Sequence, residues 1–97
     1  MGTVNKDTLC PSCGFDFFRE FGFKPWNGES PSDEICPSCG IQFGYTDMAG
    51  GDKKKRQEIY KQWRKEWIRN GMLWDKGNSK PPENWDPEEQ IKRIKDN

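Results

Sequence analysis

The stretches LCPSCGFDFF, residues 9 to 18, and ICPSCGIQFGY, residues 35 to 45, share the word CPSCG. We call its two copies the first knuckle (residues 10–14) and the second knuckle (residues 36–40). Each contains a Cys-x-x-Cys turn, which brings two sulfur atoms close enough to share one ion. Two such turns supply the four ligands of a tetrahedral zinc ion, each at about 2.3 Å. The repeat therefore predicts one metal site. Its ligands are Cys10, Cys13, Cys36 and Cys39.

The residues beside the cysteines favour the same geometry in both knuckles. Pro11 and Pro37 follow the first cysteine of each turn, where proline fixes φ and reduces the number of unfolded conformations. Gly14 and Gly40 follow the second cysteine, where we expect a positive φ that glycine adopts at little cost. The two knuckles are therefore predicted to have the same backbone shape.

Four cysteines also permit other chemistry. The two pairs are separated by 22 residues, slightly more than the usual separation of about 15 to 20 residues in such zinc sites. An oxidised chain allows three disulfide pairings, and a single Cys-x-x-Cys turn can form a dithiol redox centre. Four thiolates also suit iron. The second copy makes metal coordination a simpler explanation than a redox centre, and we expect the metal to be zinc, with iron as the alternative.

The composition argues against catalysis. The chain has no histidine, so the site contains no imidazole ligand and no imidazole base for a nucleophile. With all four positions filled by sulfur, a zinc ion has no open position for a catalytic water. We expect one structural metal ion, no catalytic residue, no small-molecule substrate and no enzyme activity.

Length and hydrophobic content indicate a thin core. The chain has 97 residues, of which 31% are hydrophobic and 33% are charged. A single domain over residues 1–97 is expected, and a domain this small usually needs a metal or disulfides for stability. The N-terminus has no apolar run typical of a signal peptide, and no stretch of about 18 apolar residues could span a membrane. We therefore expect a cytoplasmic protein without membrane contact.

The segments around the knuckles predict an α+β fold. Residues 15–23 are aromatic and partly alternating, so they are interpreted as a strand that leaves the first knuckle. Residues 24–33 are interpreted as a turn-rich return, and residues 34–45 as a strand into and out of the second knuckle. The expected fold is a four-cysteine zinc ribbon with rubredoxin-like knuckles over residues 8–46, packed against helices.

Two helices are predicted after the ribbon. The first covers residues 52–70, with Asp52 as N-cap and Gly71 just beyond its end. One side of this helix carries an apolar stripe expected to pack on the ribbon; its members are Ile59, Tyr60, Trp63 and Trp67. Residues 71–85 are expected to form an ordered strap. A short helix follows over residues 86–96, with Asp86 as N-cap.

The formal net charge is zero but unevenly divided. Residues 1–50 contain three Lys or Arg and seven Asp or Glu, whereas residues 51–97 contain thirteen and nine, so the halves carry −4 and +4. The polar side of the long helix is a candidate surface for an acidic partner; the residues assigned to it are Lys54, Lys61, Arg64 and Lys65. Phenylalanines of residues 15–23 could stack on nucleic-acid bases, but we expect them to form core.

Several words of the chain resemble a known group of proteins. The two Cys-Pro-x-Cys knuckles, SPSDEICPSCGIQFGY, WRKEWIRNGMLW and PENWDPEEQI together resemble small uncharacterised bacterial proteins related to the cysteine-rich CPCC family. Members commonly have Cys-Pro-Cys-Cys at the first knuckle, where this chain has Ser12 in the third position. The knuckles also resemble those of rubredoxins, which hold iron. The resemblance implies a bacterial metal-binding protein.

These observations predict a non-catalytic zinc-binding module that mediates contact with another protein. The uneven charge and the five tryptophans favour this class. Two alternatives remain open from the sequence: a zinc ribbon that binds nucleic acid through the basic helix, and a rubredoxin-like electron-transfer protein that holds iron.

Overall fold

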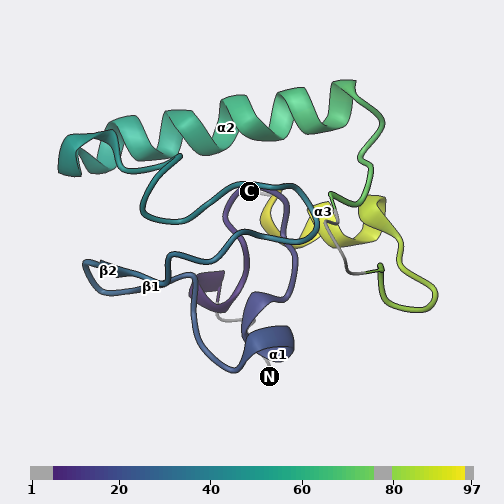
Figure 1. The fold of residues 1–97 in the computed structure, drawn as a ribbon. Coiled ribbons are helices and arrows are strands. Elements are labelled where there is room, and N and C mark those ends of the chain that lie inside the picture. Colours follow the sequence, from purple (N-terminus) through teal and green to yellow (C-terminus); the bar gives the residue numbers. More distant parts are fainter. Residues whose placement is uncertain (1–5, 76–79, 96–97) are drawn as a thin grey trace.

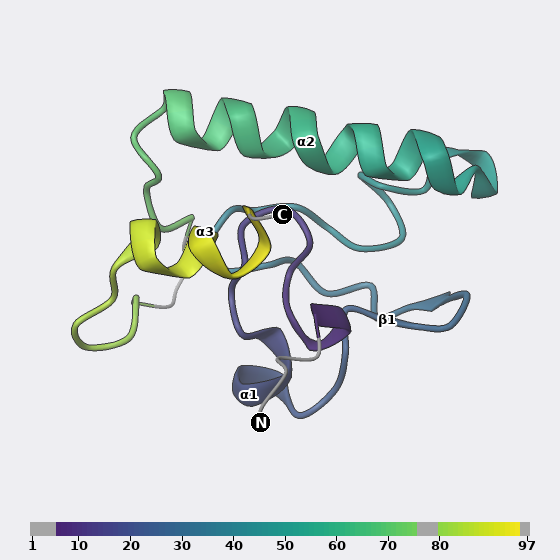
Figure 2. The same ribbon diagram turned by 180° about the vertical axis from the view of Figure 1, so that it is seen from behind.

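A computed structural model gives the structure of the chain and describes residues 6–75 and 80–95 (Figure 1). In chain order the elements are η1 (Lys6–Thr8), α1 (Phe17–Phe21), β1 (Trp26–Asn27), β2 (Ser30–Pro31), η2 (Ala49–Gly51), α2 (Lys53–Arg69) and α3 (Pro87–Lys95). Helix α2 runs along one side of the molecule, and the knuckles, the hairpin, α1 and α3 lie on the other (Figures 1 and 2). The structure confirms a small α+β fold with a two-stranded antiparallel hairpin. None of the described helices has the length and apolar character needed to cross a membrane.

The strand predicted over residues 15–23 is wrong, because this segment contains the helix α1. The Asp16 side chain accepts a hydrogen bond from the Arg19 amide at 3.2 Å and caps the helix start. Gly22 ends the helix with φ of 82°, and its amide donates to the Phe18 carbonyl. Helical spacing brings the rings of Phe17 and Phe21 to a centroid distance of 4.6 Å. Local capping therefore decides the conformation, and the aromatic alternation does not.

The hairpin lies within the segment predicted as a turn-rich return. Trp26 pairs with Pro31, and Asn27 pairs with Ser30. Gly28 lies in the connecting turn with φ of 64°, a conformation that glycine adopts readily. The second predicted strand, residues 34–45, contains only one isolated antiparallel bridge among its described residues, between Ile35 and Gln42. Each knuckle turn is thus held by a few backbone bonds without a long ribbon.

Both predicted helices are present. Asp52 caps α2 by accepting hydrogen bonds from the amides of Lys54 and Lys55 at 2.9 and 3.2 Å. Gly71 follows the C-cap with φ of 97°. On the predicted apolar stripe of α2, Tyr60 and Trp67 are buried.

Asp86 caps α3 in the same way. Its side chain accepts hydrogen bonds from the amides of Glu88 and Glu89 at 3.0 and 3.3 Å. Residue 96 of the predicted short helix lies outside the described residues.

The strap expected over residues 71–85 is held by aromatic contacts at its two ends, and residues 76–79 lie outside the description. The Trp74 ring packs edge-to-face on two other rings. The distance between ring centroids is 5.6 Å to Phe15 and 5.1 Å to Trp85. Leu73 behaves differently, because 69% of its surface is exposed. The tryptophans therefore anchor the strap to the core.

The core forms around the cysteines. Phe17 is fully buried and packs edge-to-face on Phe43 at 5.4 Å. The buried cluster also includes residues of α2 and α3; its members are Cys10, Cys13, Phe15, Phe17, Cys36, Cys39, Ile41, Phe43, Tyr60, Trp67 and Ile91. Four of these eleven are cysteines, so the two knuckles contribute a large part of the buried core.

A buried carboxylate, which the sequence analysis did not single out, joins three parts of the fold. Asp47 has no exposed surface and accepts hydrogen bonds from the Trp26 indole at 2.8 Å, the Gly44 amide at 2.7 Å and the Tyr60 hydroxyl at 2.5 Å. The Arg56 guanidinium lies 4.0 Å from the centre of the Trp26 ring. The hairpin, the loop after the second knuckle and α2 are thereby fixed to one another.

Candidate metal centre

The two knuckles have the same backbone geometry. In the first, the Cys10 amide donates to the Phe15 carbonyl and the Gly14 amide to the Cys10 carbonyl, both at 2.8 Å. The second knuckle repeats both bonds at the equivalent positions, again at 2.8 Å. Gly14 and Gly40 share a φ of 85°, as the sequence predicts. The repeated word CPSCG therefore gives a repeated local structure.

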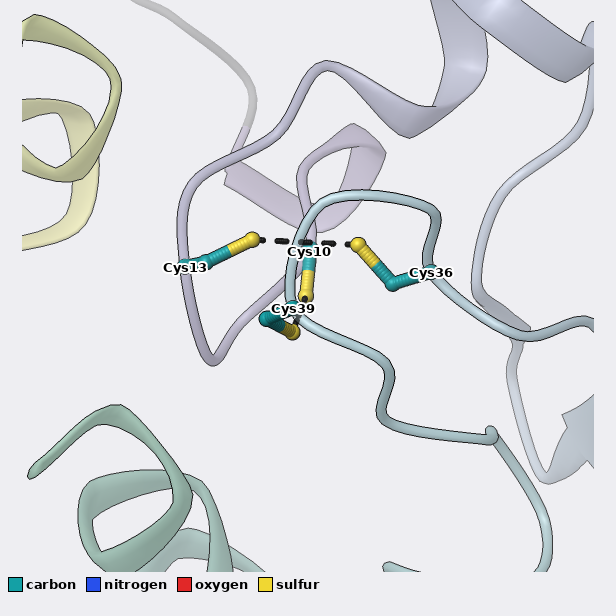
Figure 3. A group of neighbouring side chains, drawn as sticks. All are labelled: Cys10, Cys13, Cys36 and Cys39. Atoms are coloured by element: carbon teal, nitrogen blue, oxygen red, sulfur yellow. Dashed lines mark hydrogen bonds between the residues drawn. The ribbon is translucent and has the colours of Figure 1, made fainter. Parts of the chain in front are cut away.

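The turns bring the four cysteines together. All four sulfur atoms lie within 4.8 Å of one another; they belong to Cys10, Cys13, Cys36 and Cys39, hereafter the cysteine cluster (Figure 3). The sulfurs of Cys10 and Cys39 are 3.8 Å apart, and those of Cys13 and Cys36 are 3.7 Å apart. A tetrahedron with metal–sulfur bonds of about 2.3 Å has sulfur–sulfur edges of about 3.8 Å. The cysteine cluster therefore fits a tetrahedral metal ion and could hold one.

The electrostatics of the cysteine cluster also suit a cation. Burial raises the pKa of Cys36 and of Cys39, and hydrogen bonds with the Cys10 and Cys13 thiols raise both further. Burial also acts to raise the pKa of Cys13, but hydrogen bonds from the other three thiols and from Ser38 hold it below the usual range. Several thiolates in such a buried site require a compensating cation, because burial disfavours the ionised form and like charges repel one another.

Helix α3 fastens the two knuckles to each other through Gln90, a residue that sequence reasoning missed. The Gln90 amide nitrogen donates to the Cys13 carbonyl at 3.2 Å and to the Ser38 hydroxyl at 2.9 Å. Its oxygen accepts from the Trp85 indole at 2.8 Å, which fixes the orientation of the amide. A signal was present in the sequence, because Gln90 is four residues before Ile94 and so lies on the same side of the predicted helix.

Helix α2 holds the knuckles from the opposite side. The Arg64 guanidinium donates to the carbonyls of Ser12 at 2.9 Å and Pro11 at 3.0 Å. The Trp63 indole donates to the Cys39 carbonyl at 2.9 Å. Side chains of α2 therefore satisfy the hydrogen-bonding capacity of backbone carbonyls in both knuckles.

The four residues assigned to a partner surface do not share one environment. Lys54, Lys61 and Lys65 are exposed on the outer side of α2, where they are free to contact another molecule. Arg64 is half-buried, and its guanidinium is bound to the first knuckle. The structure therefore places three of the four on one accessible surface and gives Arg64 a structural contact.

Neither a family model, nor a curated protein, nor a solved structure matches this chain. The resemblance to CPCC-related proteins accordingly stays a prediction.

Proposed function

We propose that this chain is a non-catalytic zinc-binding module that mediates contact with another protein. The observation that carries the metal assignment is the cysteine cluster, whose four sulfurs lie within 4.8 Å of one another in the buried centre of the fold. The separations of 3.7 and 3.8 Å support tetrahedral coordination, as in zinc-ribbon or rubredoxin-like knuckles. Four sulfur ligands leave no position for a catalytic water, which supports a structural role.

A groove beside α1 supports the choice of a protein partner. Phe18 and Phe23 are 45% and 43% exposed, although large aromatic side chains are usually buried. Together with Pro31 they line a groove of about 390 Å³ between α1 and the hairpin. Exposed aromatic side chains at a groove are typical of surfaces that bind an apolar side chain of a partner protein.

The metal is tested first. The full chain is expressed at its native level and purified without added metal. Inductively coupled plasma mass spectrometry is expected to find one equivalent of zinc per chain. A Cys36→Ser variant is expected to lose the metal. A coloured protein with one equivalent of iron would contradict zinc and favour electron transfer, whereas a metal-free chain that does not take up zinc would refute the metal site.

The partner is tested by affinity purification with paired surface variants. A tagged chain is expected to retain a protein after nuclease treatment and at high salt. A Phe18→Ser, Phe23→Ser double variant with normal metal content is expected to lose that protein. If the double variant still retains the protein, the groove is not the binding surface, and the proposed partner site at this groove is wrong.

Nucleic-acid binding is the second candidate function. Lys54, Lys61 and Lys65 are exposed and, at about 100° per residue, share one face of α2. A variant with glutamine at these three positions provides the matched control. Loss of bound nucleic acid in this variant, together with a steep decrease of binding with salt, would favour this candidate over the first.

A further inference from the structure

One of the four cysteines differs from the others in its access to solvent. Cys10, Cys13 and Cys36 have no exposed surface, whereas Cys39 retains 7%. The difference is small in area, but a reagent must reach a sulfur atom before it can react. Cys39 is thus the only one of the four cysteines that retains exposed surface.

A cavity leads to Cys39. It has a volume of about 470 Å³ and lies between the C-terminal part of α2 and the chain that follows it; its lining residues are Cys39, Trp63, Glu66, Trp67, Asn70, Leu73, Trp74 and Asp75. Leu73, one of these lining residues, is 69% exposed. The other three cysteines do not line it.

The walls of the cavity discriminate among reagents by charge and polarity. The indole N–H groups of Trp63 and Trp67 already donate to the carbonyls of Cys39 and Leu73, both at 2.9 Å, so the rings contribute mainly apolar surface. Glu66 and Asp75 add carboxylates to the lining, which disfavour anionic reagents. A small, neutral oxidant such as hydrogen peroxide or another small hydroperoxide fits these walls.

The arrangement of the sulfurs selects the product. The Cys10 sulfur lies 3.8 Å from that of Cys39 and belongs to the other knuckle (Figure 3). Cys13 and Cys36 form the second close pair at 3.7 Å. A disulfide bond needs a sulfur–sulfur distance of about 2.05 Å, so each of these pairs must close by less than about 2 Å.

We propose that Cys39 is a modification site for small hydroperoxides, and that its oxidation forms a Cys10–Cys39 disulfide which releases the bound metal. The inference rests on the proposed function, because the metal it releases is the one assigned to the cysteine cluster. It adds a chemical event by which the module loses its metal.

The two steps balance. The Cys39 thiolate attacks the OH oxygen of the hydroperoxide, the O–O bond breaks, that OH group stays on sulfur as a sulfenic acid, and the other oxygen leaves as hydroxide or alkoxide. The Cys10 thiolate then attacks the Cys39 sulfur, the S–S bond forms, and the S–O bond breaks with loss of a second hydroxide. The two sulfurs lose two electrons to the peroxide, and the metal keeps its oxidation state. Because two of the four ligands are consumed, the ion is released.

The experiment uses the metal-loaded full chain and less than one equivalent of hydrogen peroxide. Remaining thiols are alkylated at successive times, the chain is cleaved without reduction, and fragment spectra assign each disulfide. Cleavage after Arg19 separates the two knuckles. A coloured chelator follows metal release in parallel. The Cys10–Cys39 disulfide is expected to form first, at the same rate as the metal appears.

Two variants test the route to Cys39 without changing any cysteine. Leu73→Ala widens the entrance of the cavity and is expected to accelerate disulfide formation and metal release several-fold. Tyr45→Ala removes a side chain that is 66% exposed and does not line this cavity, so its rate is expected to equal that of the unchanged chain. Equal rates in all three proteins would refute the cavity as the route.

The remaining outcomes also decide the proposal. A Cys13–Cys36 or Cys36–Cys39 disulfide that forms first, or metal retained with intact thiols under excess peroxide, would overturn it. If the purified chain binds no zinc, the proposed function fails and this proposal fails with it. A chain that binds zinc but forms a different disulfide first contradicts this proposal alone.

Discussion

Gly14 and Gly22 have almost the same backbone conformation, with φ of 85° and 82°, but different surroundings. A Cβ atom at Gly14 would overlap the backbone carbonyl of Gln90 in α3, whereas a Cβ atom at Gly22 would meet no non-adjacent atom of the described residues within 4 Å. Gly22→Ala is expected to lower the free energy of unfolding by about 1 kcal/mol through backbone strain alone. Gly14→Ala is expected to lower it by about 3 kcal/mol or more, because α3 must move.

Urea unfolding of both variants measures this difference, since the strain of a positive φ is common to the pair. Equal losses of stability would show that α3 does not lie against the first knuckle in solution. The comparison therefore tests a contact that joins residues 14 and 90.

Asp47 is a second residue whose replacement is expected to reduce the free energy of unfolding strongly. Asp47→Ala would leave the Trp26 indole, the Gly44 amide and the Tyr60 hydroxyl without their acceptor in a buried site. We expect a loss of about 3–5 kcal/mol in the free energy of unfolding. Tyr60→Phe is the control, with an expected loss of about 1 kcal/mol, because only one donor disappears.

Burial raises the pKa of Tyr60, and the hydrogen bond to Asp47 raises it further, so the hydroxyl remains a donor at neutral pH. Thermal unfolding at pH 7 compares the two variants. Similar melting temperatures for Asp47→Ala and Tyr60→Phe would contradict the role of Asp47 as a junction of three segments.

At the scale of elements, Gln90 decides how α3 docks. Gln90→Met keeps the side-chain size but removes the donors to the Cys13 carbonyl and the Ser38 hydroxyl and the acceptor of the Trp85 indole. We expect a loss of about 2–4 kcal/mol and faster amide exchange throughout α3. Hydrogen exchange followed by mass spectrometry measures the second effect.

Lys92→Met is the control for this change, because Lys92 is 69% exposed and its ion pair with Glu89 is on the surface. Its exchange rates are expected to match those of the unchanged chain. Unaltered protection of α3 in Gln90→Met would indicate that apolar contacts hold the helix without the amide.

The start of α2 contains a charge pattern that opposes helix stability. Lys53, Lys54 and Lys55 occupy the first turn, where the helix dipole disfavours cations, and no acidic side chain is present in that turn. Replacement of all three with glutamine is expected to raise the free energy of unfolding by about 0.5–1 kcal/mol. Lys61→Gln, in the middle of the helix, is expected to have little effect. A decrease after the triple change would mean that these lysines make stabilising contacts.

For the whole molecule, metal and fold are expected to be lost together. Four of the eleven members of the buried core cluster are cysteines. Removal of a bound ion would therefore take away the bonds that hold these four side chains together within the core. A strong chelator is expected to abolish the near-ultraviolet circular dichroism and much of the helical signal, because zinc binding free energy in small domains is largely folding free energy. Zinc is expected to restore both signals.

Acid is expected to remove the metal and unfold the chain, as the chelator does. Protons compete with the metal for the thiolates, so the affinity of the cysteine cluster for the metal falls as pH falls. Metal release and circular dichroism, measured on the same samples, test the coupling. A chelated protein that keeps its native spectrum would show that the fold does not need the ion.

Local interactions explain what the sequence determined by itself. The knuckles follow from a repeated word whose proline and glycine fix the turn, and α2 and α3 follow from Asp52 and Asp86 at their N-caps. The cysteine cluster was predicted in full, because ligand type and spacing are properties of short segments. The error over residues 15–23 is also local, since the cap at Asp16 outweighs the aromatic pattern.

Only the tertiary structure decided which residues support the cysteine cluster and which remain on the surface. Gln90 binds a carbonyl 77 positions away, and Arg64 binds carbonyls 52 and 53 positions away. Asp47 similarly depends on Trp26 and Tyr60, which come from different elements. No pattern within one segment encodes these pairs, because they exist only when packing brings separate segments to hydrogen-bonding distance. The exposure of Cys39 has the same origin, since its cavity is enclosed by α2 and by the chain that follows it.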